Sequence, residues 1–167
     1  MPELAHVLVV EQDADVRSLI AEVVREAGYS VTEVSTLPAA LHALLVSDQP
    51  QVVVLDMQMP DDFLTSGVMP LTGEFQPSEL LVVMADEGVL HGHTFVLLTS
   101  DSLFWLPPSL LRLRSKMALS VVTMPIDVDD LLHAVKQAAE RLRRLASDAG
   151  GDAEGEGATG TGPAGAS

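Results

Sequence analysis

The sequence predicts an α/β fold with a doubly wound, five-stranded parallel sheet in the strand order 2-1-3-4-5. The runs that begin at Val7, Val52 and Phe95 are entirely apolar, which is typical of strands buried on both faces of a parallel sheet. The runs at 31–34 and 120–125 are mixed in polarity and are expected at the two edges. Segments with apolar residues at helical spacing separate the runs, as crossovers between parallel strands require.

The first half of the chain alternates strands with helices. After the first strand, Asp13 is placed to cap a helix whose apolar residues recur every three or four positions as far as Gly28. Glycine is favoured just after the end of a helix. Thr36 and Pro38 are expected to begin a second helix after the strand at 31–34.

The second half begins with a long stretch, 61–77, that is rich in Gly and Pro and is expected to be a loop. We expect a helix over 78–90, a strand over 94–100 and a short helix over 107–116. After the last strand, Asp127 caps a final helix that has acids in its first turn and arginines in its last, which suits the helix dipole.

The composition predicts one domain over residues 1–146, followed by a disordered tail over 147–167 that is rich in Gly, Ala and acids. The chain has no cysteine, which excludes disulfides and thiol chemistry. Its apolar runs are too short to span a bilayer, and its acidic N-terminus does not resemble a signal peptide. We therefore expect a soluble, cytoplasmic protein that does not bind membranes.

The net charge of −15 argues against a nucleic-acid partner, because phosphate contacts need clustered Lys and Arg. Only Arg17 and Arg25 are basic before residue 112, and the other bases lie between 112 and 147. Single charges there are explained by a solvated helix surface. The region 109–146 is also a candidate basic face for a protein partner or a homodimer.

Asp56 comes directly after the central apolar strand, at the end where ligands bind in open parallel sheets. It is therefore a candidate nucleophile or metal ligand, and a turn cap before Pro60 is the alternative. Glu11 and Thr99 follow or end the two neighbouring strands in the predicted order. The three side chains should gather at one edge of the sheet.

With these residues placed, the chain resembles the receiver domain of two-component response regulators over residues 5–146. The resemblance rests on Val7–Val10 followed by acids and by Asp15-Val16-Arg17, on Asp56 with Met59-Pro60, on Thr99-Ser100, and on Met124-Pro125. It implies that Asp56 accepts a phosphoryl group from a histidine kinase and that Thr99 is the switch hydroxyl. It also implies a Mg²⁺ ion held by Glu11, Asp56 and the backbone carbonyl of Gln58.

The sequence departs from the family pattern in four places. Gln12 replaces the second acid after the first strand, and Asp13 beside it is better placed to cap the helix. Met124 replaces a lysine, so the charge that would contact the phosphoryl oxygens is missing. Val121 replaces the aromatic switch residue, and the loop at 61–77 lengthens the connection to the fourth strand. These changes predict slow or undetectable phosphorylation and weak Mg²⁺ binding.

Two functions remain open from the sequence. The first is a stand-alone, atypical receiver that signals by binding a protein partner, either a kinase, a phosphotransfer protein or a downstream regulator. The second is a working single-domain phosphorelay protein phosphorylated on Asp56. An enzyme is not expected, because Gln58 stands where a phosphohydrolase that used Asp56 would need another acid. His91 and His93 lack an evident third ligand and do not predict a metal site.

Overall fold

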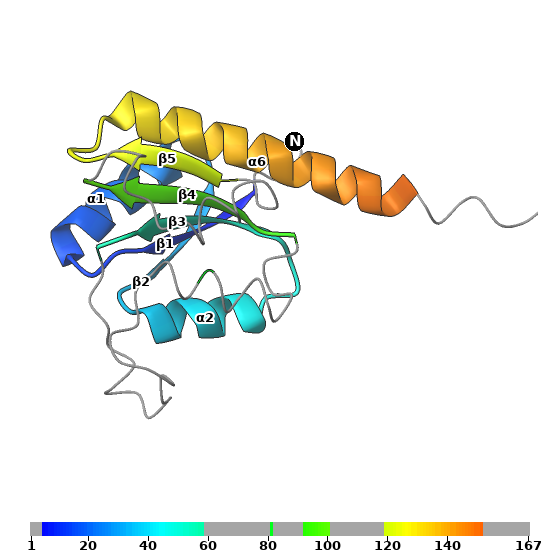
Figure 1. Ribbon diagram of the computed structural model, residues 1–167, viewed down its shortest axis with the longest axis horizontal. Helices are drawn as coiled ribbons and strands as arrows, with labels where there is room; N and C mark the ends of the chain where they lie inside the picture. The colour runs from blue at the N-terminus through cyan, green and yellow to red at the C-terminus, as the bar shows by residue number, and fades with distance from the viewer. Residues whose placement is uncertain (1–4, 59–80, 82–91, 101–118, 152–167) are drawn as a thin grey trace, which may run out of the picture.

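The computed structural model describes residues 5–58, 81, 92–100 and 119–151 of the chain. Within these residues lie the strands β1 (His6–Val10), β2 (Ser30–Val34), β3 (Gln51–Asp56), β4 (Thr94–Thr99) and β5 (Leu119–Thr123). Every neighbouring pair is parallel, and the order is β2-β1-β3-β4-β5 (Figure 1). The predicted fold class and strand order are confirmed.

The inner strands β1, β3 and β4 are almost completely buried, whereas the edge strands β2 and β5 are only partly buried. The polarity of each run had predicted this arrangement, because an edge strand keeps one side in solvent. The last strand differs slightly from its predicted range, since it begins at Leu119 and ends at Thr123. Met124 therefore lies just beyond the end of β5.

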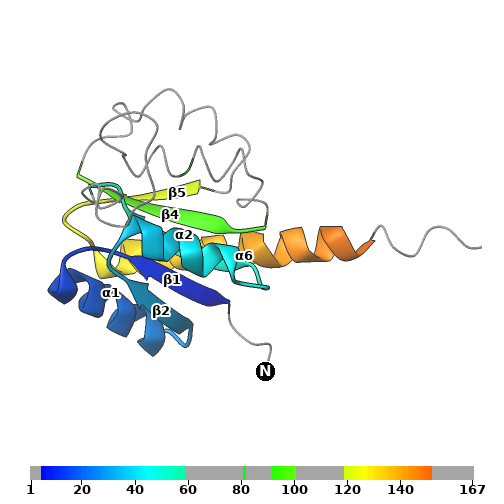
Figure 2. The same cartoon turned by 90° about the horizontal axis from the view of Figure 1, so that it is seen from below.

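Three described helices cover the sheet. The helices α1 (Ala14–Glu26) and α6 (Val128–Gly151) lie on one face, and α2 (Leu37–Leu45) lies on the other (Figures 1 and 2). Successive strand residues point to opposite faces, so Val7 and Val9 pack under α1 and α6 while Leu8 and Val10 pack under α2. This division explains why the inner strands have no polar face.

The helix starts follow the predicted capping chemistry. The carboxylate of Asp13 accepts hydrogen bonds from the N–H groups two and three residues on, at 2.9 and 3.0 Å. The Thr36 hydroxyl caps α2 and the Asp127 carboxylate caps α6 in the same manner. Gly28 has a positive φ of 96° just after α1, a conformation that a side chain disfavours.

The helix α6 is longer than the sequence predicted. It runs to Gly151, so residues 147–151 are helical where a disordered tail was expected, and residues 152–167 lie outside the described part. Extending a helix that is already packed costs little, because the unfavourable step is forming its first turn. The Ser147 hydroxyl donates to the carbonyl oxygen of Arg143 at 3.0 Å within this extension.

Several sequence predictions fall outside the described residues. These are the loop at 61–77, the helix at 107–116 and most of the helix at 78–90. Leu81 is the one described residue of the last segment. It is helical, fully buried and packed with the core beneath α2. Among the helices described, none combines the length and the apolar character needed to cross a membrane.

The amino ends of β3 and β4 are joined by a buried histidine. The Gln51 N–H donates to Nδ1 of His93 at 3.1 Å, so this nitrogen must be unprotonated. Burial lowers the pKa of His93 below its ordinary value. The folded protein therefore holds this ring neutral at a pH where the unfolded chain already binds a proton.

We expect this histidine to make the protein less stable as the pH falls below about 6.5, the ordinary pKa of histidine. The slope is at most about 1.4 kcal/mol per pH unit, or roughly 3 °C in Tm for a domain of this size. Thermal melts from pH 7.5 to 5 of the wild type and of His93→Asn, which does not titrate, isolate the effect as the difference between two curves. Parallel curves would show that another group is responsible.

Candidate functional site

The parallel register brings three predicted site residues to the carboxyl edge of the sheet. Asp56 ends β3 and pairs with Leu98 of β4, and Val10 of β1 pairs with the residue before Asp56. Glu11 follows Val10, and Thr99 ends β4. Glu11, Asp56 and Thr99 are only 4 %, 9 % and 4 % exposed. Polar groups are seldom buried at a sheet edge without a partner or a task.

Asp56 is held by the turn that follows it. Its Oδ1 accepts a hydrogen bond from the backbone N–H of Gln58 at 2.9 Å. The N–H of Met57 donates to the carbonyl oxygen of Leu98 at 2.9 Å, which ties the same turn to β4. Burial raises the pKa of Asp56, and the Gln58 N–H offsets part of that effect. The carboxylate is therefore oriented but costly to keep ionised.

Glu11 is the second carboxylate of the site. Its Oε1 accepts from the Asp13 N–H at 2.9 Å, and its own N–H donates to the carbonyl oxygen of Val34 at 3.2 Å. Burial raises the pKa of Glu11 most, and the negative charges of Asp56 and Asp13 raise it further. The register places Glu11 and Asp56 at the ends of neighbouring strands, and the raised pKa of Glu11 is consistent with two buried carboxylates in one poorly solvated space.

The donor set suits a magnesium ion in number and type. Mg²⁺ in proteins is held by one or two carboxylates, with phosphate oxygens and water completing the octahedron. Glu11 and Asp56 supply two carboxylates that repel each other, and a divalent cation would offset that repulsion. Across the described ranges no group of three or more His, Cys, Asp or Glu could hold a metal ion, so these ranges supply two carboxylates to the site.

The two residues after Glu11 do not add a ligand to this set. Gln12 is exposed and its amide is neutral. The Asp13 carboxylate caps α1, as the sequence predicted, and it is also exposed. With Gln12 in place of an acid, the site has one carboxylate fewer than the family pattern implies.

A backbone hydrogen bond joins the ends of β4 and β5 beside the site. The N–H of Met124 donates to the carbonyl oxygen of Thr99 at 2.8 Å. The Met124 side chain is partly buried and packs with the core beneath α1 and α6, whereas Val121 packs with the core beneath α2. An apolar side chain at position 124 therefore joins the core and cannot neutralise charge at Asp56.

Gln58 lies in the turn that follows β3. It is exposed, but its side-chain amide donates to the hydroxyl of Ser100. This bond links the turn after β3 to the turn after β4. Sequence patterns do not reveal it, because the two residues belong to different turns.

Arg17 is the site residue that the sequence interpretation did not recognise. Its Nη1 donates to the carbonyl oxygens of Glu11 and Gln12 at 2.9 and 3.1 Å. A signal was present, because only two bases occur before residue 112 and Arg17 is placed just after the acidic turn. Its carbonyl partners, however, appear only in three dimensions.

A family model described as "Response regulator receiver domain" matches residues 7–72. No curated protein shows a significant match. The match spans the acidic turn and Asp56.

Solved receiver domains share the fold at low sequence identity. The CheY-like receiver domain protein of Methanospirillum hungatei JF-1 is 19 % identical with a TM-score of 0.63, covering 83 % of this chain and 97 % of that one. The signal receiver domain of a putative Luxo repressor protein from Vibrio parahaemolyticus is 20 % identical, with a TM-score of 0.66 and coverages of 90 % and 99 %. The beryllofluoride-activated NtrC4 receiver domain dimer is 21 % identical, with a TM-score of 0.62 and coverages of 82 % and 98 %.

We expect Asp56→Asn to raise the Tm in metal-free buffer at pH 7 by about 2–4 °C, roughly what 1 kcal/mol gives for a domain of this size. A raised carboxyl pKa contributes stability below the ordinary pKa that is lost as the pH rises through the folded value. The wild type lacks this stability at pH 7, and asparagine, which stays neutral, does not lose it.

The gain should shrink as the pH falls through the raised folded pKa of Asp56, and it should be lost by about pH 4, the ordinary pKa of an aspartate, because the wild-type carboxyl is then protonated too. Differential scanning calorimetry from pH 7.5 to 3.5 measures it. Asp48→Asn, at an exposed position, is the matched control and should leave Tm unchanged. A destabilised Asp56→Asn at pH 7 would contradict the proposed cost of the buried charge.

Proposed function

We propose that this chain, which is a receiver domain of two-component signalling, acts mainly by binding protein partners and is phosphorylated only slowly on Asp56. Residues 1–146 would form the receiver domain, and 147–167 a tail whose first residues extend α6. The observation that carries the proposal is the pairing of a retained acid site with an apolar Met124. The machinery that places Asp56 is kept, and the charge that would assist transfer is not.

The retained features keep phosphorylation chemically feasible. Phosphoryl transfer depends on positioning and on neutralising negative charge around phosphorus. Asp56 is oriented by the Gln58 N–H, and Glu11 shares its poorly solvated space. Bound Mg²⁺ would supply the neutralising charge, with Glu11, Asp56 and the Gln58 carbonyl as its protein ligands. Thr99, at the end of β4, would contribute the switch hydroxyl.

The lost features argue for slow transfer. A charge-assisted hydrogen bond contributes about 1.5–3 kcal/mol, and a lysine at position 124 could make one to a phosphoryl oxygen. Gln12 removes one carboxylate from the cation site, which predicts weak Mg²⁺ binding. Val121 is too small for the rotamer change that an aromatic side chain makes in the family pattern. A fully functional phosphorelay protein, with a histidine kinase as its phosphoryl donor, is therefore the second candidate.

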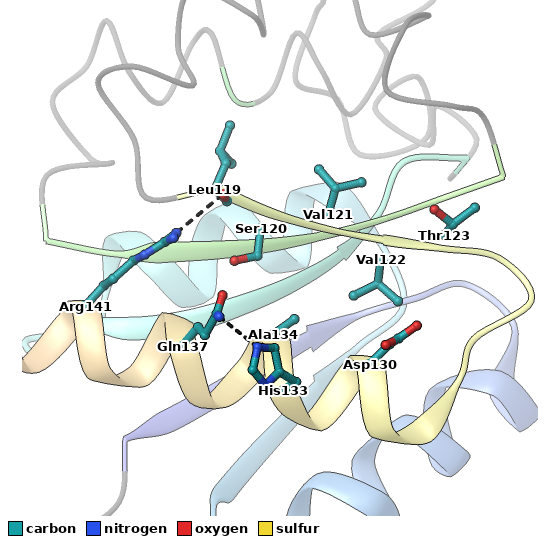
Figure 3. A pocket seen from close by; sticks show the side chains of 10 residues that line it. All are labelled: Leu119, Ser120, Val121, Val122, Thr123, Asp130, His133, Ala134, Gln137 and Arg141. Carbon is teal, nitrogen blue, oxygen red and sulfur yellow. Dashed lines mark hydrogen bonds between the residues drawn. The ribbon is translucent and has the colours of Figure 1, made fainter.

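The groove between β5 and α6 is the binding surface we favour (Figure 3). It has a volume of about 440 Å³ and is lined by the edge strand and by one side of α6. Arg141 reaches from α6 to the backbone oxygen of Leu119 at 3.5 Å, and Gln137 is hydrogen bonded to His133. The groove is thus polar and partly ordered by its own side chains.

The charges along α6 favour a second copy of the chain as a partner. Asp130, His133, Gln137 and Arg141 line the groove, and helical periodicity places exposed Arg144 on the same side. Two antiparallel α6 helices centred on Gln137 would bring Asp130 of each copy opposite Arg144 of the other. Such mutual pairing is what a two-fold symmetric interface requires. A kinase, a phosphotransfer protein or a downstream regulator with an acidic surface is the alternative partner.

We expect wild-type protein to be labelled slowly by acetyl phosphate with Mg²⁺, and Met124→Lys to be labelled roughly 10- to 150-fold faster, which is the rate equivalent of about 1.5–3 kcal/mol. Intact-protein mass spectrometry over time measures both rates. Met124→Leu, which keeps an apolar side chain of similar size, should label like the wild type. Asp56→Asn should not be labelled.

Rapid, complete labelling of the wild type, unchanged by Met124→Lys, would overturn slow phosphorylation and establish the phosphorelay function. Beryllofluoride titration with Mg²⁺, followed by NMR, gives an independent readout of the same site. Saturable binding at low concentration that disappears in Asp56→Asn would support the same conclusion.

The proposed dimer can be tested by reversing the charges at its interface. We expect Arg144→Glu to weaken self-association by about 3- to 10-fold, since an exposed pair contributes up to about 1 kcal/mol and occurs twice. The double variant Asp130→Arg with Arg144→Glu should recover most of the loss. Sedimentation equilibrium at low salt measures the dissociation constants. A monomeric wild type at the highest concentration tested would exclude the homodimer and leave another protein as the partner.

A further inference from the structure

The backbone of the acidic turn is held by a single side chain from the next helix. Arg17 lies near the start of α1, and its Nη1 donates to the carbonyl oxygens of Glu11 and Gln12 at 2.9 and 3.1 Å. Its own N–H donates to the carbonyl oxygen of Asp13 at 2.8 Å. The carbonyl groups of three consecutive residues after β1 thus all accept hydrogen bonds from Arg17.

The Arg17 guanidinium also forms an ion pair with Glu33 of the edge strand β2. Oε2 of Glu33 lies 3.8 Å from Nε of Arg17, and Oε1 of Glu33 accepts from Nη2 of Arg25 at 2.8 Å. The side chains of Arg17 and Glu33 are 19 % and 26 % exposed, whereas that of Arg25 is 49 % exposed. Ion pairs that are partly buried are less screened by salt than exposed pairs.

Arg17 does not act on Glu11 by neutralising its carboxylate. The pKa of Glu11 is raised, by burial first and then by the charges of Asp56 and Asp13. The guanidinium is instead directed at backbone carbonyls and at Glu33. Its effect on the site must pass through the position of the turn that carries Glu11.

We infer that Arg17, oriented by Glu33, is a positioning residue for Mg²⁺ binding, because it fixes the turn that presents the Glu11 carboxylate beside Asp56. The inference rests on the proposed Mg²⁺ site. Residues that hydrogen bond to metal ligands and orient them typically contribute roughly 10- to 100-fold to metal affinity. Because the described residues supply two carboxylates to this set, we expect the placement of each to matter for the affinity.

The test is Mg²⁺ affinity, measured by isothermal titration and by competition with Mn²⁺ in electron paramagnetic resonance. We expect Arg17→Lys to raise the Mg²⁺ dissociation constant by about 10-fold. Lysine keeps the positive charge but cannot bridge two carbonyls and a carboxylate. Arg25→Gln is the matched control, because Arg25 also pairs with Glu33 but makes no hydrogen bond to the turn, and its affinity should equal that of the wild type.

A second variant keeps the inference testable should Arg17→Lys fail to fold. Glu33→Gln removes the charge that orients Arg17 and should weaken Mg²⁺ binding by a smaller factor, with a cooperative thermal melt. Wild-type affinity in folded Arg17→Lys would overturn the positioning role. Normal binding by Arg17→Lys together with weakened binding by Arg17→Gln would overturn it as well, because charge alone would then be the cause.

The failure of this inference can be told from the failure of the proposed function. Glu11→Gln and Asp56→Asn each remove a proposed ligand and should abolish specific Mg²⁺ binding. Loss in both, with no change in Arg17→Lys or Glu33→Gln, leaves the site standing and removes Arg17 from it. Unchanged binding in both ligand variants would place the ion elsewhere and overturn the inference together with the site.

Discussion

The constraint on which the site depends is the burial of two carboxylates at the carboxyl edge of an all-parallel sheet. Core packing determines where these carboxylates lie. Glu11 follows β1 and Asp56 ends β3, and the register of these two apolar strands is set by packing on both faces of the sheet. Shifting either strand by one residue would turn its apolar side chains to the wrong face. The core that stabilises the fold therefore also brings two carboxylates to one buried edge, where burial raises the pKa of both and the Asp56 charge raises that of Glu11 further.

The turns after the strands reduce this cost without removing it. Both carboxylates accept backbone N–H donors, including that of Asp13 for Glu11 and that of Gln58 for Asp56. Contacts farther out then hold these turns in place, through Arg17 at the first and the Gln58–Ser100 bond at the second. Backbone N–H donors orient the two carboxylates but do not neutralise their negative charge. A bound cation would neutralise it.

Much of the fold could be predicted from the sequence, because unbroken apolar strands, helix caps and mixed edge strands are local signals. The acids of the site could be predicted for the same reason, since they follow those strands. The Arg17–Glu33 pair could not, because it joins α1 to β2 through contacts that no spacing encodes. The length of α6 was underestimated, since Gly, Ala and acids predicted disorder where an already packed helix continues. Propagation of a helix that had already formed overrode local composition there.

The departures from the receiver pattern at Val121 and Met124 gather on one strand and its end. Both side chains pack with the hydrophobic core, one with each face of the sheet. Met124 also keeps the backbone bond from its N–H to Thr99, so replacing a lysine there removes charge from the site while the strand geometry persists. Because the same strand forms one wall of the β5–α6 groove, the binding surface proposed above does not need a charge at position 124. The missing lysine at position 124 and the proposed binding surface are thus physically compatible.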